Sequence, residues 1–270
     1  MQTKIIAQLR NMKLYWQEVK DPALWDNADF VLAAVWQDWE TFQFASARLK
    51  KDKEFVIAVV EQGRPGWPAF RFAADSLKKD RTLVLNLIQR KGVLLQFAAP
   101  KLRKDRLLVL AAIAQDGYAL RFAAPRLKKD KWLVLSAVEN NWQALQFAHK
   151  SLQKDRDIVL AAVEQDWQAL QYADESLRKD REIVLAAVEQ DWRATRYVDE
   201  SLRKDREIVL TAAKHNIYVL RFFADISLRK DKEFMLDAIQ QDWNAIQCVD
   251  ESLLKDPDIM RTRIRLAGNP

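Results

Sequence analysis

LRKDREIVLAAVEQDW, at residues Leu177–Trp192, returns almost unchanged from Leu202 onward, one repeat later. Looser copies of this string run nearly end to end, and a fixed period of this size is typical of a repeat array. An Asp that follows Lys leads each copy, and an Asn holds its place in the first copy. Successive lead residues are 25 residues apart, except for one interval of 28 and one of 26. The lead residues are Asn27, Asp52, Asp80, Asp105, Asp130, Asp155, Asp180, Asp205, Asp231 and Asp256.

Each copy begins with the pattern of an amphipathic α-helix. In the copy at residues 155–179, Asp155 precedes the apolar stripe and is predicted to be the N-cap, whose carboxylate accepts free amide hydrogens of the first turn. The acid two places on, Asp157 here, suits the positive end of the helix dipole. The stripe has the helical period and consists of Ile158, Val159, Leu160, Ala162 and Val163.

A second helix is predicted in the same copy, with Asp166 as its N-cap. Its buried side is expected to hold Ala169, Leu170, Tyr172, Ala173 and Leu177. Helices of about ten residues are marginal alone, so their order has to come from stacking on neighbouring copies. The column of Leu177 is leucine in every copy, at Leu24, Leu49, Leu77, Leu102, Leu127, Leu152, Leu177, Leu202, Leu228 and Leu253.

We therefore expect an all-α fold, an α-solenoid of about nine 25-residue helix-turn-helix repeats with capping segments at both ends. Residues 1–26 would form an N-terminal capping helix, and residues 256–270 a C-terminal capping helix and tail. Two insertions, at residues 63–66 and near Ile226, fall in predicted turns. The array itself would span residues 27–255, with repeats that start near residues 27, 52, 80, 105, 130, 155, 180, 205 and 231.

The string D-x-x-[IV]-V-L-x-A-V-x-Q-D-x-x-A-L-x-[FY]-A-x-x-x-L is similar to a family of short helical repeats of bacteria and some protists, domain of unknown function 4116. The resemblance covers roughly residues 27–260 and implies a helical array without established catalytic residues. The family often has glycine after the second Asp; Gly92 and Gly117 keep it, but six copies have Trp. The motif is carried by Asp155, Val159, Leu160, Ala162, Val163, Asp166, Ala169, Leu170, Tyr172, Ala173, Leu177 and their copies.

Composition argues against an enzyme and against a membrane protein. Apolar residues make up 49% of the chain, which suffices for a continuous core, yet no apolar stretch approaches the roughly 20 residues of a membrane helix. We see no zinc-ligand spacing, phosphate-binding glycine loop or nucleophilic triad, and His149 and His215 occupy variable polar positions. Cys248 is predicted to be a small core residue. We expect no cofactor, no metal, no small-molecule substrate and a cytoplasmic location, with secretion as an effector left open.

Three columns of side chains could carry function. Tryptophan recurs at the turn between helices, and these indoles either seal the edge of the core or form a half-exposed ladder that stacks a ligand. On the second helix a column contains only Gln and Arg, which either cover apolar stems or act as a modular reader of single-stranded RNA. The two columns are Trp39, Trp67, Trp142, Trp167, Trp192, Trp243 and Gln43, Arg71, Gln96, Arg121, Gln146, Gln171, Arg196, Arg221, Gln247.

The third column is basic and flanks the lead Asp. It holds 24 of the 44 Lys and Arg residues, which form either a solvated edge or a track for an acidic partner or nucleic acid. Residues 90–131 contain eleven Lys and Arg against three Asp, a net charge of +8. We call this region the basic edge, and expect its docking residues to be Lys101, Arg103, Lys104, Arg106, Arg121, Arg126, Lys128, Lys129 and Lys131.

The sequence favours a non-catalytic scaffold that binds a protein with an acidic or mixed surface through the basic edge. Nucleic-acid binding along the same edge or the Gln/Arg column is the alternative, and it predicts steep salt dependence. A third reading is a recently expanded or engineered array without a ligand. Charge reversal at Arg103, Lys104, Lys128 and Lys129 is expected to weaken partner binding and leave the melting temperature unchanged.

Overall fold

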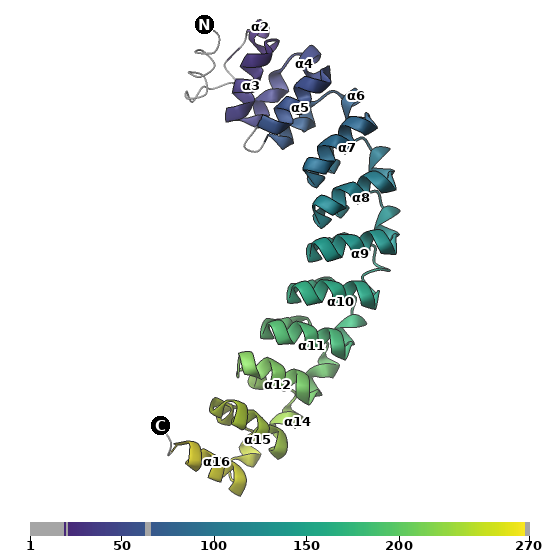
Figure 1. The fold of residues 1–270 in the computed structure, drawn as a ribbon. Helices are drawn as coiled ribbons and strands as arrows, with labels where there is room; N and C mark the ends of the chain where they lie inside the picture. Colours follow the sequence, from purple (N-terminus) through teal and green to yellow (C-terminus); the bar gives the residue numbers. More distant parts are fainter. Residues whose placement is uncertain (1–18, 20, 63–65, 268–270) are drawn as a thin grey trace. The chain divides into compact units, whose positions relative to one another are not determined.

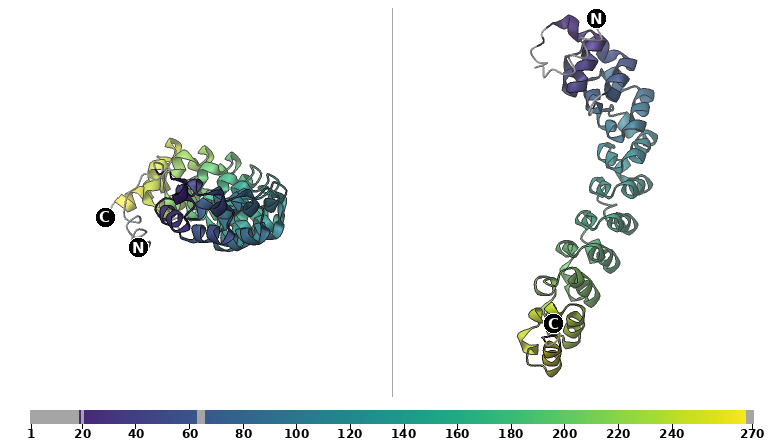
Figure 2. Two further views of the ribbon diagram at one scale, coloured as in Figure 1. Left: turned by 90° about the horizontal axis from the view of Figure 1, so that it is seen from above. Right: turned by 60° about the vertical axis from the view of Figure 1, so that its left-hand side comes forward.

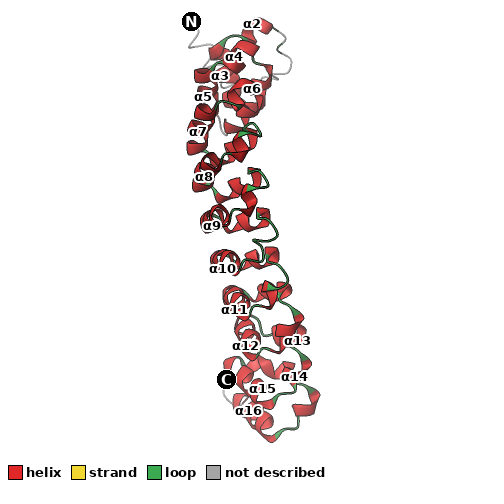
Figure 3. Cartoon of the chain, turned by 90° about the vertical axis from the view of Figure 1, so that its right-hand side faces the viewer, coloured by secondary structure: helices red, strands yellow, loops and turns green. Residues whose placement is uncertain are grey.

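The protein is an all-α repeat solenoid, as the period predicts. The computed structural model describes residue 19 and residues 21–62 and 66–267, and these contain helices and loops but no strand (Figure 1, Figure 3). Contacts divide the chain into two units, which we call the N-terminal unit (Met1–Phe147) and the C-terminal unit (Ala148–Pro270). Within each unit, consecutive repeats lie side by side in chain order (Figure 2).

The first helix of each repeat is a regular α-helix of ten residues, and its last copy has eleven. These are the longer helices in Figure 1. In the N-terminal unit they are α3 (Ala28–Gln37), α5 (Lys53–Gln62), α7 (Arg81–Arg90), α8 (Arg106–Gln115) and α9 (Lys131–Asn140). In the C-terminal unit they are α10 (Arg156–Gln165), α11 (Arg181–Gln190), α12 (Arg206–His215), α15 (Lys232–Gln241) and α16 (Pro257–Ala267).

The predicted N-caps are confirmed. Oδ1 of Asp180 accepts the amide hydrogens of Glu182 and Ile183, at 3.1 and 3.3 Å. The side chain of Asn27 does the same for Phe30, at 3.0 Å. Because an N-cap is worth about 1 kcal/mol, the lead residues fix where each α-helix begins.

The prediction of one continuous second helix is wrong. The six residues that follow the second Asp of a repeat form a 3₁₀ helix. Asp166 caps its helix as expected, because its Oδ1 accepts a hydrogen bond from the amide of Gln168 at 2.8 Å. The chain then leaves the helix at Ala173, which is extended. These 3₁₀ helices are η2 (Trp39–Phe44), η3 (Trp67–Phe72), η4 (Gly92–Phe97), η6 (Gly117–Phe122), η8 (Trp142–Phe147), η9 (Trp167–Tyr172), η11 (Trp192–Tyr197) and η13 (Trp243–Cys248).

The 3₁₀ helix ends here because the extended chain that follows it hydrogen-bonds to the preceding repeat. The amide of Asp174, directly after the break, donates to the carbonyl oxygen of Gln153 at 2.9 Å. A further short helix then carries the leucine column in most repeats. These are α4 (Ala47–Lys51), α6 (Asp75–Lys78), η5 (Leu102–Lys104), η7 (Leu127–Lys129), η10 (Leu177–Lys179), η12 (Glu200–Lys204), α14 (Ile226–Arg229) and η14 (Glu251–Leu253).

The core of each unit is a strip of apolar side chains to which all three segments of most repeats contribute. In the repeat that begins at Asp155, its members include Ile158 and Val163 of α10, Leu170 of η9 and Leu177 of η10. Tyr172, expected on the buried side, is half-buried. In the leucine column, Leu202 and Leu253 are half-buried and Leu24 is exposed, whereas the other copies are buried.

The late insertion lies close to the predicted position near Ile226. The amide of Asp225 donates to the carbonyl oxygen of Arg203, as that of Asp199 does to Arg178 one repeat before, so the register is already restored at Asp225. The extra residue therefore lies shortly before Asp225. It converts the usual 3₁₀ helix into the α-turn α13 (Val219–Phe222).

At the ends of the chain, most of the predicted N-terminal cap lies outside the described residues, as do residues 63–65 and 268–270. The part that is described contains a short helix, α2 (Pro22–Trp25). At the other end, Arg261, Arg263 and Arg265 of α16 are exposed. The capping role of both segments stays a prediction.

Candidate interaction surface

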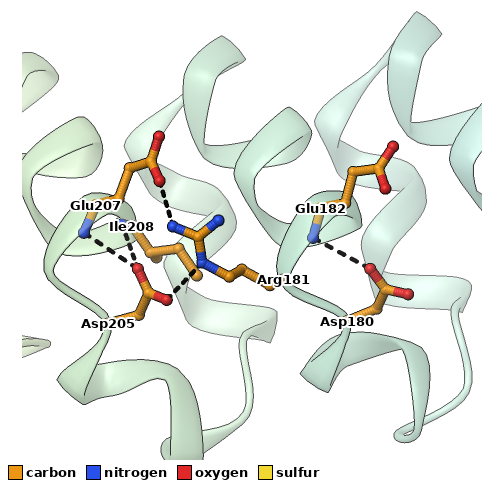
Figure 4. A network of polar contacts seen from close by, with 6 residues as sticks. All are labelled: Asp180, Arg181, Glu182, Asp205, Glu207 and Ile208. Carbon is orange, nitrogen blue, oxygen red and sulfur yellow. Dashed lines mark hydrogen bonds and ion pairs between the residues drawn. The ribbon is translucent and has the colours of Figure 1, made fainter.

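The lead Asp has a second function that joins neighbouring repeats. Oδ1 of Asp205 caps α12 by accepting from the amides of Glu207 and Ile208, both at 3.1 Å. Its other oxygen, Oδ2, accepts from Nε of Arg181 in the preceding repeat at 2.7 Å (Figure 4). The Arg181 guanidinium also contacts the Glu207 carboxylate. One carboxylate therefore starts a helix and binds the repeat before it.

The same ion pair recurs along both units, and we call the set the ion-pair ladder. In each rung a Lys or Arg directly after one lead Asp pairs with the lead Asp of the next repeat. Both partners are partly exposed, so screening by solvent keeps the contribution of each single rung to stability small. The rungs, with N–O distances of 2.7 to 3.1 Å, are Lys53–Asp80, Arg81–Asp105, Arg106–Asp130, Arg156–Asp180, Arg181–Asp205, Arg206–Asp231 and Lys232–Asp256.

These contacts lower the pKa of ladder carboxyl groups. Arg106 holds the pKa of Asp130 below its ordinary value chiefly by donating a hydrogen bond, while partial burial acts in the opposite direction. Arg81 acts in the same way on the pKa of Asp105. Protonation of either group therefore weakens a junction between repeats.

We predict that the protein loses stability on acidification partly through these rungs. Because the pKa of Asp130 is lower folded than unfolded, its stabilisation is complete above the unfolded value of about 3.9 and is lost as the pH falls through the folded value. Urea midpoints measured from pH 6 to pH 2.5 should fall, and Asp130→Asn should show a smaller fall than the parent. An equal fall in parent and variant would contradict the prediction.

The expected docking residues do not form one free electrostatic surface. Arg106 is a ladder rung. Lys128 is half-buried, donates to the carbonyl oxygen of Arg121 at 2.8 Å, and has a lowered pKa because burial and then the Arg121 charge disfavour its protonated form. Nη2 of Arg126 donates to the carbonyl oxygen of Lys104 at 3.0 Å, across to the preceding repeat. Lys128 and Arg126 therefore already make hydrogen bonds within the protein.

The other docking residues differ in their freedom. Arg103 is half-buried, and its Nε is buried without a hydrogen-bond partner among the described residues. Nη1 of Arg121 donates to the Tyr118 hydroxyl at 2.9 Å, and its guanidinium also lies 5.9 Å from the centre of the Phe147 ring. Lys131 is half-buried, whereas the side chains of Lys101, Lys104 and Lys129 are exposed. Charge reversal at Arg103 and Lys128 is thus expected to lower the melting temperature, contrary to the expectation from sequence.

Two exposed apolar residues lie beside the basic edge and were not predicted from the sequence. Leu107 and Trp132 are 65% and 74% exposed, at the same position of α8 and α9, which pack against each other. Most other repeats have an acid at this position, two residues after the lead residue. A comparison of this position across the repeats therefore identifies Leu107 and Trp132 as apolar exceptions. The residues at this position are Asp29, Glu54, Thr82, Leu107, Trp132, Asp157, Glu182, Glu207, Glu233 and Asp258.

The tryptophan column packs on the neighbouring repeat. Trp39 lies 6.0 Å from Phe72, the last residue of the next 3₁₀ helix, and Trp167 lies 6.3 Å from Tyr197 in the same relation. Five of the six indoles are half-buried, and Trp243 is exposed. This arrangement matches the sealing role, and the ligand-stacking role stays a prediction.

Where glycine replaces Trp, the next repeat approaches more closely. A Cβ at Gly117 would lie 2.0 Å from the carbonyl oxygen of Ala137 in α9. The amide of Gly117 donates to Oδ1 of Asn140 at 2.7 Å. A polar pocket of about 410 Å³ opens beside these glycines, lined by Arg90, Lys91, Gly92, Val93, Gln115, Asp116, Asn140 and Asn141.

The Gln/Arg column is divided. Nε2 of Gln96 donates to the carbonyl oxygen of Val93 at 3.1 Å, and Gln146 makes the same bond to Gln143 at 3.0 Å. These glutamines fold back on their own helix, which suits a covering role. The arginines Arg71, Arg121, Arg196 and Arg221 are exposed.

The remaining candidates offer little chemistry. His149 and His215 are exposed, and Cys248 is buried, with a thiol pKa raised mainly by desolvation. Within residues 21–62 and 66–267, no three His, Cys, Asp or Glu side chains gather as a metal site would require. In the same ranges, every helix is too short or too polar to cross a membrane.

Comparison with known proteins places the chain in a family. The model of the family described as a domain of unknown function, DUF4116, matches residues 27–64, 105–153, 155–203, 180–229, 205–254 and 231–269, well over half of the chain. The chain belongs to the DUF4116 family. Each match begins at a lead residue, so the DUF4116 unit starts at the N-cap that also carries the ion-pair ladder. No curated protein and no solved structure matches the chain.

Proposed function

We propose that this protein is a non-catalytic scaffold that binds an acidic partner protein at the basic edge of its N-terminal unit. The observation that carries the proposal is the exposure of Leu107 and Trp132 where other repeats have acids. Interface hot spots are enriched in tryptophan and arginine and are surrounded by polar residues. Here Trp132 stands three residues after the exposed Lys129, and Leu107 three residues after the exposed Lys104.

Charge supports an acidic partner. Residues 1–147 contain 24 Lys and Arg against 15 Asp and Glu, a net charge of +9. Residues 148–270 contain 20 against 23, a net charge of −3. In the C-terminal unit the column of Leu107 and Trp132 is acidic, and Glu182 and Glu207 each contact an arginine of the preceding repeat. An acidic partner would therefore be attracted to the N-terminal unit and not to the other.

We predict that Leu107→Ala combined with Trp132→Ala weakens partner binding at least about tenfold, the loss expected when hot-spot side chains are truncated. Both side chains are exposed, so the urea midpoint should change little. The partner would be isolated from the native host after nuclease treatment, and its affinity for each purified variant measured by calorimetry.

Trp243→Ala is the matched control, because it removes an exposed tryptophan from the C-terminal unit. A second set, Lys101→Glu, Lys104→Glu and Lys129→Glu, tests the charges that are exposed and leaves Arg103 and Lys128 in place. The proposal would be refuted if the partner bound both the Leu107→Ala and Trp132→Ala combination and the Lys→Glu set as tightly as it binds the parent.

Nucleic-acid binding is the second candidate, favoured by the net charge of +9 in the N-terminal unit. The glutamines that bond to their own helices count against a reader built from the Gln/Arg column. In this case affinity for labelled RNA or DNA would fall steeply with salt and depend on Lys104 and Lys129 but little on Leu107. No retardation at low salt would dismiss it.

A further inference from the structure

A pocket of about 480 Å³ lies between two consecutive repeats of the C-terminal unit, whereas the basic edge belongs to the N-terminal unit. We call it the aromatic–arginine pocket. Its volume falls within the range of sites for small ligands, roughly 300 to 1,000 Å³. The lining residues that matter here are Trp192, Arg196, Arg203, Tyr218, Phe222 and Phe223.

The pocket exists because of the one extra residue in this repeat. One repeat earlier, Tyr197 ends its 3₁₀ helix and packs against Trp167 at 6.3 Å. Phe222 holds the equivalent place but is 78% exposed, while Phe223 turns inward and is 8% exposed. Within the described chain, Trp192 consequently has no aromatic ring packed against it, and the space that the ring would fill is open.

The walls of the pocket are positively charged. Arg193, Arg196 and Arg203 line it, and no acidic residue does. Arg193 is bound to the carboxylate of Asp191, with Nε 3.0 Å from both oxygens. Arg196 is exposed, and Nε of Arg203 is buried without a hydrogen-bond partner among the described residues. Arg203 is also paired with Glu200 at 3.1 Å, whereas no carboxylate of the described residues pairs with Arg196, so Arg196 is the arginine best placed to attract an anionic ligand group.

We propose that the aromatic–arginine pocket binds a peptide segment in which an aromatic side chain stands next to a carboxylate. The ring would occupy the place left by Phe222, against Trp192. The carboxylate would meet Arg196, which is exposed. A polyanion such as RNA fits less well, because this unit has a net charge of −3 and Glu200 lies against Arg203 at 3.1 Å. The site is separate from the proposed basic-edge function.

The test uses the full chain and a fluorescein-labelled acetyl-Asp-Glu-Phe-Glu peptide, with binding measured by fluorescence anisotropy. Deletion of one of the two adjacent phenylalanines gives Arg-Phe-Ala-Asp, the spacing of residues 196–199 in the repeat before. The deletion should close the pocket and reduce affinity at least about tenfold, since burial of the aromatic anchor dominates such sites. Arg196→Glu, at an exposed position, should reduce affinity similarly and decides the matter if the deletion variant does not fold.

Controls separate this site from the basic edge. The combination of Leu107→Ala and Trp132→Ala should leave peptide affinity unchanged, and replacement of Phe by Ala in the peptide should abolish binding. Equal binding by the parent, the deletion variant and Arg196→Glu would overturn the proposal. Loss of binding only in Lys104→Glu or Lys129→Glu would also overturn it, as would competition by adenosine monophosphate that equals competition by unlabelled peptide.

Discussion

Gly117→Trp is expected to destabilise the N-terminal unit by about 3 kcal/mol, although Trp is the residue found at this position in six other repeats. The added Cβ alone would lie 2.0 Å from the carbonyl oxygen of Ala137 and 3.0 Å from the amide nitrogen of Asn141. Both are backbone atoms, so α9 itself would have to move away from η6. Urea unfolding followed by circular dichroism measures the loss.

The side chain at the end of α9 indicates how the close approach arose. The amide of Gly117 is bonded by Asn140, whereas that of Trp167 is bonded by the longer Gln190 at 2.9 Å. Asn140→Gln should therefore restore part of the stability lost in Gly117→Trp. Ile217→Trp, which places Trp where a β-carbon already exists, is the control and should cost less than about 1 kcal/mol. Equal stability of Gly117→Trp and the parent would show that α9 can shift freely.

Asp205→Ala is expected to lower the free energy of unfolding by about 2 kcal/mol, because it removes an N-cap and a ladder rung together. The amides of Glu207 and Ile208 lose their acceptor, and Arg181 loses its partner at 2.7 Å. Asp205→Asn should cost less than half as much, since an amide oxygen still caps the helix, as Asn27 does naturally. Urea midpoints of the two variants provide the measurement.

A double-mutant cycle with Arg181→Ala separates the two functions. Arg181→Ala should add little to the effect of Asp205→Ala, because the rung is already broken. It should cost most in the parent background. If Asp205→Ala and Asp205→Asn were equally destabilising, the cap would contribute nothing and the double function would be refuted.

The sequence predicted the fold well where a single residue type determines the geometry. The lead Asp marks the start of each α-helix, and the chain begins those helices one residue later. The second helix was predicted less well, because its end depends on a hydrogen bond to the preceding repeat, which the sequence pattern does not reveal. The amide of Asp174 reaches the preceding repeat, and this interrupts the helix between Tyr172 and Leu177.

The candidate site was predicted only in outline. Clustered Lys and Arg indicate a basic edge, but they do not show which of these side chains already bind other groups of the protein. Lys128 donates to the carbonyl oxygen seven residues before it, and Arg178 does the same to Gln171 at 2.8 Å. Arg106 is taken up by Asp130. Leu107 and Trp132 do not belong to the basic column; they interrupt a different column, which holds an acid two residues after the lead residue in most repeats.

The ion-pair ladder also explains how such a chain can change length. Each junction needs one basic residue from the repeat before and one lead Asp from the repeat after, and every copy from Asp52 to Asp231 carries both. Duplication of a whole 25-residue unit therefore creates no new kind of junction, only one more of the existing kind. Extra residues are tolerated where they lie outside the junction, since the intervals of 28 and 26 residues keep the rungs Lys53–Asp80 and Arg206–Asp231. Gain or loss of a whole unit therefore leaves each remaining junction with both of its partners.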